Sequence, residues 1–455
     1  MNTKLSHPWV KLAFTIVACT MVLASVFYKN WRYQNRILVH DSIGYYNYLV
    51  VSFIYEDIGL DFVRHNKKLL KKRLWYWVGA DGQKIFKYSL GVSLAEMPFF
   101  LIAHQLAIAD GNVDEGFADI YRLSVLCSAI FYLLLGLFYL FKILKPYFEE
   151  KSIFWTIIIL ALGTNLINYV IREPGMSHVY SFCAIAAFIY YSLRYWESPN
   201  MKTLITISVI AGLIALVRPF NVIVLVLFPL LNLSSFKELK GRFTHLIHNP
   251  KRFLLAIALF ILIFSPQLIY WKLVSGDWFV DSYVKNESFF FNDPKIIDGL
   301  FSYRKGWLLY TPLMILFFLG LFNKHSFVKR NRWLSIGFFL MSCYLIFSWW
   351  SWWYGGSFGA RPLIDYYPLF AIFIAAFLNH LLNLNLWVRR SVYLIIILLI
   401  GLNLFQFYQF EKGLIHHAGM TKKSYWMVFG KLDKPKGLIK AFDYPDNQKA
   451  REGDR

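Results

Sequence analysis

The sequence has few charged residues. Asp, Glu, Lys and Arg make up 16% of the 455 residues, whereas 57% are hydrophobic and 19% aromatic. Soluble domains carry about 25% charged residues, so this composition excludes an ordinary soluble protein. Runs rich in Leu, Ile and Phe recur along the chain, and they reach the roughly 20 residues that a helix needs to cross a bilayer. The sequence therefore predicts an all-α, polytopic membrane protein.

Cysteine is also scarce. The four cysteines are Cys19, Cys127, Cys183 and Cys343, and all of them fall in apolar runs. This usage excludes a disulfide framework and a cysteine-based metal site.

Acidic residues are fewer than basic ones, 27 against 48, which gives a formal net charge of +21. In a soluble protein this excess would suggest a nucleic-acid partner. Here the basic residues cluster in short loops, as the positive-inside rule requires, so we expect a bilayer and no nucleic acid. The three basic loops contain Lys237, Lys240, Arg242, Lys251 and Arg252, then Lys324, Lys329, Arg330 and Arg332, and then Arg389 and Arg390.

The apolar runs predict about eleven transmembrane helices. We place them near residues 9–28, 119–141, 152–171, 177–194, 203–217, 219–234, 253–274, 307–323, 333–350, 362–382 and 391–409. Residues 1–409 then form one transmembrane domain, and 410–455 form a polar, basic C-terminal tail. With the three basic loops in the cytoplasm, residues 29–118 and 275–306 become external loops.

Residues 88–108 are apolar but contain Glu96, Pro98, His104 and Gln105. If this segment crossed the membrane, either the basic loops would face outward or Asp41 would face inward, away from the other motifs. An interfacial or re-entrant helix avoids both conflicts. We therefore expect 29–118 to be one long external loop that carries juxtamembrane helices.

With this topology, the unusual charged residues gather on the external side. The first loop opens on Asp41, followed by Tyr45, and later carries Lys87. Charge beside or within a membrane is costly and usually serves function. The other external motifs contain Arg172, Glu173 and His178, then Arg218 in a break between two spans, Arg304 in the loop 275–306, and Arg361 after a glycine-rich stretch.

One acid and several cations beside a bilayer suit the transfer of a sugar from a polyprenyl phosphate to a hydroxyl group. The hydroxyl needs a base such as Asp41 to take its proton. The leaving lipid phosphate needs Lys and Arg to offset its negative charge. Glycoside hydrolysis would instead require paired carboxyl groups; Asp41 and Glu173 could form such a pair, but the excess of cations favours a phosphate leaving group.

These motifs resemble the GT-C superfamily of integral membrane glycosyltransferases, and most closely glycosyltransferase family 39, which includes protein O-mannosyltransferases and bacterial aminoarabinose transferases. The family pattern is an acid after the first span, here Asp41, and a Lys-Pro-Pro-like stretch, here Lys87-Tyr88-Ser89 without the prolines. An Arg near the next span, here Arg122, and an Arg–acid pair, here Arg172-Glu173, complete it. The resemblance covers most of residues 1–380 and is closest to a bacterial subgroup.

The resemblance implies an inverting transferase on the outer face of the bacterial inner membrane, in the cell envelope. Asp41 would be the base, and Lys and Arg residues would hold the lipid phosphate. Glu173 would position the acceptor or the sugar. Candidate contacts with the phosphate or the substrate are Lys87, Arg172, Arg218, Arg304, Arg361, His178 and Tyr45.

Several alternatives remain open. A lipid-linked glycan polymerase or ligase also uses polyprenyl carriers, but it usually lacks an acid after the first span. A transporter or flippase would carry polar residues in mid-span and often internal repeats, and no repeat is visible. No cofactor is required, although Asp41, Glu173 and His178 could together bind a divalent metal. The acceptor could be a lipid, a polysaccharide or a protein.

Overall fold

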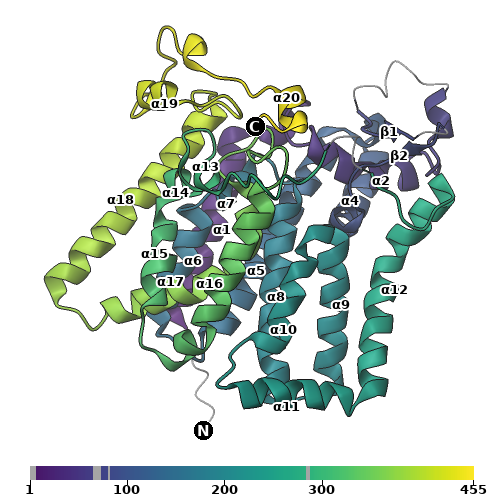
Figure 1. Ribbon diagram of the computed structural model, residues 1–455. Coiled ribbons are helices and arrows are strands. Elements are labelled where there is room, and N and C mark those ends of the chain that lie inside the picture. Colours follow the sequence, from purple (N-terminus) through teal and green to yellow (C-terminus); the bar gives the residue numbers. More distant parts are fainter. Residues whose placement is uncertain (1–6, 65–72, 80–81, 283–286) are drawn as a thin grey trace. The chain divides into compact units, whose positions relative to one another are not determined.

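The chain folds into two compact units that are almost entirely helical. The computed structural model describes residues 7–64, 73–79, 82–282 and 287–455 (Figure 1). Unit 1 comprises Met1–Val17, Phe141–Asn168 and Val284–Arg455, and unit 2 comprises Ala18–Leu140 and Tyr169–Tyr283. Helices α1 (Pro8–Tyr28), α5 (Asp119–Leu144) and α7 (Leu166–Ile171) each contribute residues to both units.

Unit 2 is a set of helices with one short β-hairpin. Its further elements are η1 (Asn30–Arg32), α2 (Asp41–Phe53), η2 (Asp61–Arg64), β1 (Trp77–Val78), β2 (Lys84–Ile85), α4 (Gly91–Ala109), η3 (Asp114–Gly116), α8 (Ser177–Glu197), α9 (Met201–Val217), η4 (Pro219–Val226), α10 (Leu227–Leu230), α11 (Phe236–Ile247) and α12 (Pro250–Ser275). The two strands pair antiparallel, with Trp77 opposite Ile85. Helices α8, α9 and α12 lie side by side, and α11 lies across one end of them (Figure 1).

Helix α4 lies at the end of unit 2 opposite to α11 (Figure 1). It is long and apolar enough to be a candidate membrane span. However, it begins against Val217, the last residue of α9. Farther along, His104 is hydrogen-bonded to Tyr121 in the first turn of α5, at 2.7 Å. These contacts place the start of α4 beside the end of α9 and His104 beside the start of α5. That residues 88–108 do not cross the membrane stays a prediction.

Unit 1 is also helical. Its elements are α6 (Glu150–Leu162), α13 (Ile296–Phe301), α14 (Trp307–Tyr310), η5 (Pro312–Met314), α15 (Ile315–Leu321), α16 (Ser326–Phe347), η6 (Arg361–Tyr366), α17 (Tyr367–Leu381), α18 (Leu386–Glu411), α19 (Lys422–Val428), η7 (Ile439–Ala441) and α20 (Asn447–Glu452). Helix α17 packs between α6 and α15, and its apolar side chains are almost wholly buried.

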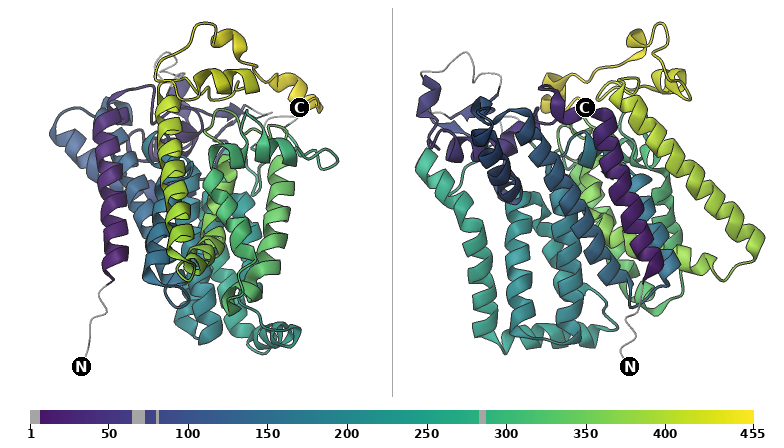
Figure 2. Two further views of the ribbon diagram at one scale, coloured as in Figure 1. Left: turned by 90° about the vertical axis from the view of Figure 1, so that its left-hand side faces the viewer. Right: turned by 180° about the vertical axis from the view of Figure 1, so that it is seen from behind.

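The C-terminal tail folds back onto unit 1, over the end at which α18 finishes (Figure 2). Its buried residues join Tyr310 and Phe358 in one hydrophobic cluster, which also contains Phe410, Leu414, Ile415, Met420, Tyr425, Val428 and Leu438. The Gln409 side chain donates to the carbonyl groups of Val428 and Lys431, at 2.6 and 2.8 Å. The predicted polar tail is therefore a packed part of unit 1.

The all-α membrane fold is confirmed, but the exact set of eleven spans is not. In the part of the chain that the structure describes, six helices are long and apolar enough to cross a membrane by length and composition. They lie at Pro8–Arg32, Gly91–Ala109, Asp114–Leu144, Pro250–Ser275, Arg361–Leu381 and Leu386–Glu411. The other predicted spans correspond to helices that are shorter, less apolar or broken.

Three predicted spans are interrupted for local reasons. The expected span 152–171 breaks between α6 and α7 at Gly163, where a Cβ would lie 2.5 Å from the Leu313 side chain. The expected span 307–323 breaks at Pro312, and the expected span 219–234 begins as a 3-10 helix at Pro219. Proline disfavours an α conformation in the residue before it. Helix α14 therefore ends before Pro312, and α9 ends before Pro219.

In each unit, basic loops lie at the end opposite to the sequence motifs. In unit 2, α11 with Lys237 and Lys240 lies across the end where α12 begins. In unit 1, Arg330 and Arg389 lie in the first turns of α16 and α18, and both helices finish toward the folded tail. Each unit alone therefore has one basic end, as the positive-inside rule describes.

The contact between α4 and α9 leaves no room for a side chain at Gly91. A Cβ there would lie 2.3 Å from backbone atoms of Leu216 and Val217. Gly91→Ala should lower the free energy of unfolding by about 1–3 kcal/mol through overpacking. The control is Gly401→Ala in α18, where a Cβ meets nothing within 4 Å. Thermal unfolding in detergent should show a loss only for Gly91→Ala, and equal effects would contradict the close contact.

Candidate functional site

Asp41 is the first residue of α2, at the end of unit 2 that also carries the β-hairpin. Its carboxylate is half-buried. The amide groups at a helix N-terminus favour a negative charge. His40, immediately before it, has a φ of 50°, a left-handed conformation that is costly for a residue with a Cβ. Such strain is often found at functional sites.

Helix α2 is held against the segment that carries Lys87. The rings of Tyr45 and Tyr88 stack, with 4.6 Å between their centroids. The Tyr48 hydroxyl donates to the Tyr88 carbonyl at 2.7 Å, and the Ser93 hydroxyl donates to the Tyr45 carbonyl. Since Tyr45 lies one helical turn after Asp41, these contacts bring the Lys87 segment to the first turns of α2.

Two buried polar side chains of α12 fix the backbone on either side of Lys87. The Phe86 amide donates to the Tyr270 hydroxyl at 2.9 Å, and the Leu90 amide donates to Gln267 Oε1 at 2.9 Å. Both side chains are almost fully buried. The Lys87 carbonyl itself accepts from the Ser282 hydroxyl at 2.7 Å. The backbone of this segment is therefore set by α12 and the residues that follow it.

The Arg172-Glu173 loop connects α7 to α8 and lies beside the start of α2. A Cβ at Gly175 would lie 3.0 Å from the Cβ of Ser42, the residue after Asp41. Arg172 and Glu173 are half-buried. His178, in the first turn of α8, is 2% exposed and makes an edge contact with the Tyr169 ring at 5.1 Å.

Arg218 lies where α9 ends and η4 begins, in an extended conformation with φ −156° and ψ 102°. Its guanidinium group lies over the Phe220 ring at 5.9 Å. Its neighbour Val217 packs in one cluster with Tyr45, Val92 and Tyr180. The segments that carry Asp41, Lys87, Glu173 and Arg218 therefore meet at one end of unit 2.

Arg304 and Arg361 belong to unit 1. Arg304 donates to the Ala418 carbonyl at 3.1 Å and pairs with Asp443 at 2.8 Å. Burial lowers the pKa of the Arg304 guanidinium, and the Asp443 carboxylate partly offsets this. Arg361 is half-buried at the start of η6, after Gly359 with a φ of 64°. Their predicted contacts with phosphate or sugar remain predictions, as do all the assigned roles.

The sequence patterns did not indicate that Gln267, Tyr270 and Tyr180 support the candidate site. Gln267 follows Pro266 inside an otherwise apolar run, and this polar residue was the available signal. Tyr180 donates to Glu96 Oε1 at 3.0 Å, and Glu96 is 1% exposed. The sequence singled out Glu96 only as an argument against a membrane span. Its burial at the start of α4 makes it part of the packing beneath Tyr45.

The predicted divalent metal alternative concerns Asp41, Glu173 and His178. Over the residues that the structure describes, no group of three or more His, Cys, Asp or Glu side chains is arranged so that it could hold a metal ion.

The Tyr270 hydroxyl can be tested by a single-atom change. Tyr270→Phe removes the acceptor of the buried Phe86 amide and should lower the free energy of unfolding by about 1–3 kcal/mol. Tyr55→Phe is the matched control, because the buried Tyr55 hydroxyl has no hydrogen-bond partner among the residues that the structure describes. Thermal unfolding should be lowered by the first change and not by the second. A neutral Tyr270→Phe would show that α12 does not anchor the segment.

Comparison with known proteins gives a family match over part of the chain and a similar fold. Residues 95–271, less than half of the chain, match the family model described as dolichyl-phosphate-mannose-protein mannosyltransferase. Comparison with curated protein sequences gives no match. The apo form of an Archaeoglobus fulgidus oligosaccharyltransferase has a similar structure, with a TM-score of 0.50 and 13% identity, over 98% of this chain and 61% of that chain.

A second similar structure is the oligosaccharyltransferase AglB from Archaeoglobus fulgidus, in complex with an inhibitory peptide and a dolichol-phosphate. Its TM-score is 0.48 at 13% identity, over 97% of this chain and 61% of that chain. The present chain thus spans about three fifths of the length of these proteins. The resemblance to membrane glycosyltransferases is therefore supported by sequence over residues 95–271, and the structural similarity shows a shared fold.

Proposed function

We propose that the protein is a membrane glycosyltransferase that moves a sugar from a polyprenyl phosphate to a hydroxyl acceptor. One observation carries the proposal. The segment that opens on Asp41 meets the segments of Lys87, Glu173 and Arg218 at one end of unit 2. The match of residues 95–271 to the mannosyltransferase family model supports the same reaction class.

In the proposed reaction, Asp41 is the general base. Its carboxylate takes the proton of the acceptor hydroxyl while the hydroxyl oxygen forms a bond to the anomeric carbon of the sugar. A positioned base of this kind typically contributes about 10²–10⁴ to the rate. The bond from the anomeric carbon to the phosphate oxygen breaks in the same step, so the configuration inverts.

The leaving group is the polyprenyl phosphate, which departs with the bonding electrons. Lys87, Arg172 and Arg218 supply positive charge for this growing negative charge, and preorganised cations act strongly where water is excluded. Arg361 is a further candidate for a contact with phosphate or sugar, whereas Arg304 pairs with Asp443 and lines a separate cavity of unit 1. Glu173 positions the acceptor or the sugar, and His178 and Tyr45 line the same end of unit 2.

We place the reaction on the external face of a bacterial inner membrane. The support comes from each unit by itself, because basic residues lie at the end opposite to the motifs. The positive-inside rule assigns such basic ends to the cytoplasm. The proposed site then opens toward the periplasm, where acceptors of the cell envelope are available.

The role of Asp41 predicts a specific loss. Asp41→Asn should reduce sugar transfer by about 10²–10⁴, while the protein still folds and inserts. The control is Asp110→Asn, which removes an exposed carboxylate at the end of α4 in the same unit. The measurement incubates purified protein in lipid nanodiscs with a radiolabelled polyprenyl-phosphate sugar and an extract of envelope acceptors, and follows the release of sugar from the lipid. Near-normal transfer by Asp41→Asn would remove Asp41 from the mechanism.

The same assay separates the alternatives. A transporter or flippase moves the intact lipid and releases no sugar, and a polymerase or ligase transfers an assembled glycan from a diphosphate-linked lipid. Release of single sugars from the monophosphate carrier is the expected result.

The phosphate role predicts a loss of donor affinity. Lys87→Ala and Arg361→Ala should each weaken binding of polyprenyl phosphate about ten- to a hundred-fold, because a hydrogen bond to a charged group is worth about 1.5–3 kcal/mol. Lys240→Ala, in α11 at the other end of unit 2, is the control. Binding of a fluorescent polyprenyl phosphate without sugar isolates this contact. Unchanged affinity in both variants would overturn the assignment.

A further inference from the structure

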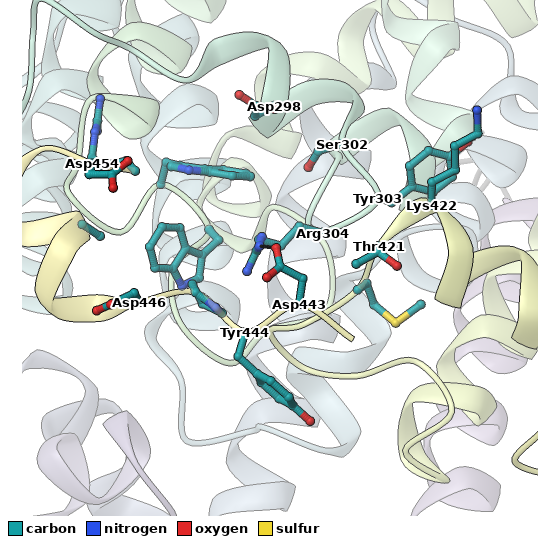
Figure 3. Close-up of a pocket in the computed structure, with 16 residues that line it drawn as sticks. Asp298, Ser302, Tyr303, Arg304, Thr421, Lys422, Asp443, Tyr444, Asp446 and Asp454 are labelled. Atoms are coloured by element: carbon teal, nitrogen blue, oxygen red, sulfur yellow. Dashed lines mark hydrogen bonds and ion pairs between the residues drawn. The ribbon is translucent and has the colours of Figure 1, made fainter. Parts of the chain in front are cut away.

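Unit 1 contains a cavity that the proposed transfer site does not use. Its volume is about 570 Å³, within the range of about 300–1,000 Å³ typical of small-molecule sites. It lies where α18 finishes, between the residues that follow α13, the Trp352–Trp353 turn and the folded tail (Figure 3). This end of unit 1 is opposite to the basic first turns of α16 and α18.

Salt bridges and buried hydrogen bonds fix the walls of the cavity. In Figure 3, the Arg304 guanidinium points to Asp443 of the tail, and the two groups are 2.8 Å apart. Lys305 is 1% exposed, and its ammonium donates to the Ser357 and His417 carbonyls. These contacts hold the loop after α13 and the tail in one arrangement, so the cavity is preorganised.

The last helix of the tail is fixed in the same way. Arg451 of α20 pairs with Glu287 at 3.2 Å, and its guanidinium lies over the Trp350 ring at 4.7 Å. This contact ties the wall that contains Asp446 and Asp454 to the body of unit 1.

The lining of the cavity contains both aromatic rings and polar side chains, and the polar side chains are distributed around it. Tyr444 is 56% exposed, whereas Trp352 and Trp353 are 7% and 4% exposed. Figure 3 shows Asp298 and Ser302 on one side of Arg304 and Tyr444 on the other. Ring faces can pack against the C–H faces of a sugar ring, and carboxylates accept hydrogen bonds from neighbouring hydroxyl groups.

The charge of the lining does not favour phosphate. The cations of the lining are Arg304, Arg455 and Lys422; Arg304 and Arg455 each face an aspartate, Asp443 and Asp293, at 2.8 and 3.4 Å, and Lys422 is exposed. Asp298, Asp446 and Asp454 also line the cavity and are exposed. A ligand rich in hydroxyl donors and without negative charge therefore matches the lining better than a lipid phosphate.

We propose that this cavity binds a saccharide, and that the saccharide is the hydroxyl acceptor. The second clause rests on the proposed function. The tail follows the last long apolar helix, α18, so it belongs to the aqueous layer at the membrane surface, where a water-soluble glycan can reach it. The acceptor class is then a neutral glycan chain, one sugar of which is held by Tyr444 and Asp298.

A binding experiment without a donor lipid tests whether the cavity binds a saccharide. The full chain in nanodiscs is titrated with soluble mannopentaose, with the pentamer of N-acetylglucosamine, and with a basic decapeptide, and calorimetry follows each. Tyr444→Ala and Asp298→Ala should weaken saccharide binding about ten-fold or more. Asp433→Ala removes an exposed acid of the tail that does not line the cavity, and it should leave the affinity unchanged.

Three results would overturn the saccharide site: no binding of either saccharide to the unmodified protein, preferential binding of the peptide, or equal affinities in all variants. Far-ultraviolet circular dichroism and thermal unfolding establish that Tyr444→Ala and Asp298→Ala are folded.

The transfer assay tests whether the bound saccharide is the hydroxyl acceptor. With a saccharide that binds as acceptor, Tyr444→Ala and Asp298→Ala should raise the KM for the acceptor about ten-fold, with little change in kcat or in the affinity for the donor lipid. If saccharides bind in the cavity but no sugar leaves the donor lipid in any condition, the proposed function fails and the binding site stands. If transfer proceeds with an unchanged acceptor KM in both variants, the acceptor assignment fails and the proposed function stands.

Discussion

The hydrogen bonds from residues 86–90 to Gln267 and Tyr270 are the interactions on which the candidate site depends. Both side chains belong to α12, an otherwise apolar helix, and burying such polar groups is costly unless they are paired. The backbone amides of Phe86 and Leu90 donate to the Tyr270 hydroxyl and to Gln267 Oε1, so these two buried acceptors are paired. The pairing works in both directions, because an irregular backbone near the membrane also needs partners for its own amides. The buried polar side chains of α12 and the irregular backbone of residues 86–90 thereby fix the position of the segment that carries Lys87.

Proline places the other charged residues. Glu173, Arg218 and Arg361 each come directly before a proline, and a residue in this position is disfavoured in an α-helix. Helix α7 ends two residues before Glu173 and α9 ends at Val217, directly before Arg218, whereas Arg361 begins η6. The extended backbone of Arg218 between α9 and η4 is the clearest case. A charge at a helix end can reach polar surroundings, whereas the same charge in mid-helix would face hydrocarbon at a cost of about 2.5–3.5 kcal/mol. Glu173, Arg218 and Arg361 thus each precede a proline at a position where the charge can lie outside the hydrocarbon layer.

Local patterns predicted the membrane class, the position of α1, α5, α12 and α18, and the segment that opens on Asp41, because these depend on hydropathy and short spacing. The sequence could not predict which residues support the site. Gln267 and Leu90 are separated by 177 residues, and no periodicity links them. Helix breaks at Gly163 were also missed, since a glycine is required there only because Leu313 approaches it in space. The resemblance to GT-C enzymes identifies candidate charged residues. It does not identify buried side chains such as Gln267 and Tyr270, which position the backbone near them.

The tail illustrates why composition misleads at the end of such a chain. Residues 410–455 are polar and basic, which predicted a polar C-terminal tail, yet Tyr425 and Leu438 enter a buried cluster. The stretch Ser302–Trp307 explains the difference, because its two cations meet the tail. Arg304 pairs with Asp443, and Lys305 binds the His417 carbonyl. In the proposed scheme, Lys87, Arg172 and Arg218 of unit 2 bind the phosphate, whereas Arg304 pairs with Asp443 of the tail. The carboxylates that remain around Arg304 suit a ligand rich in hydroxyl groups.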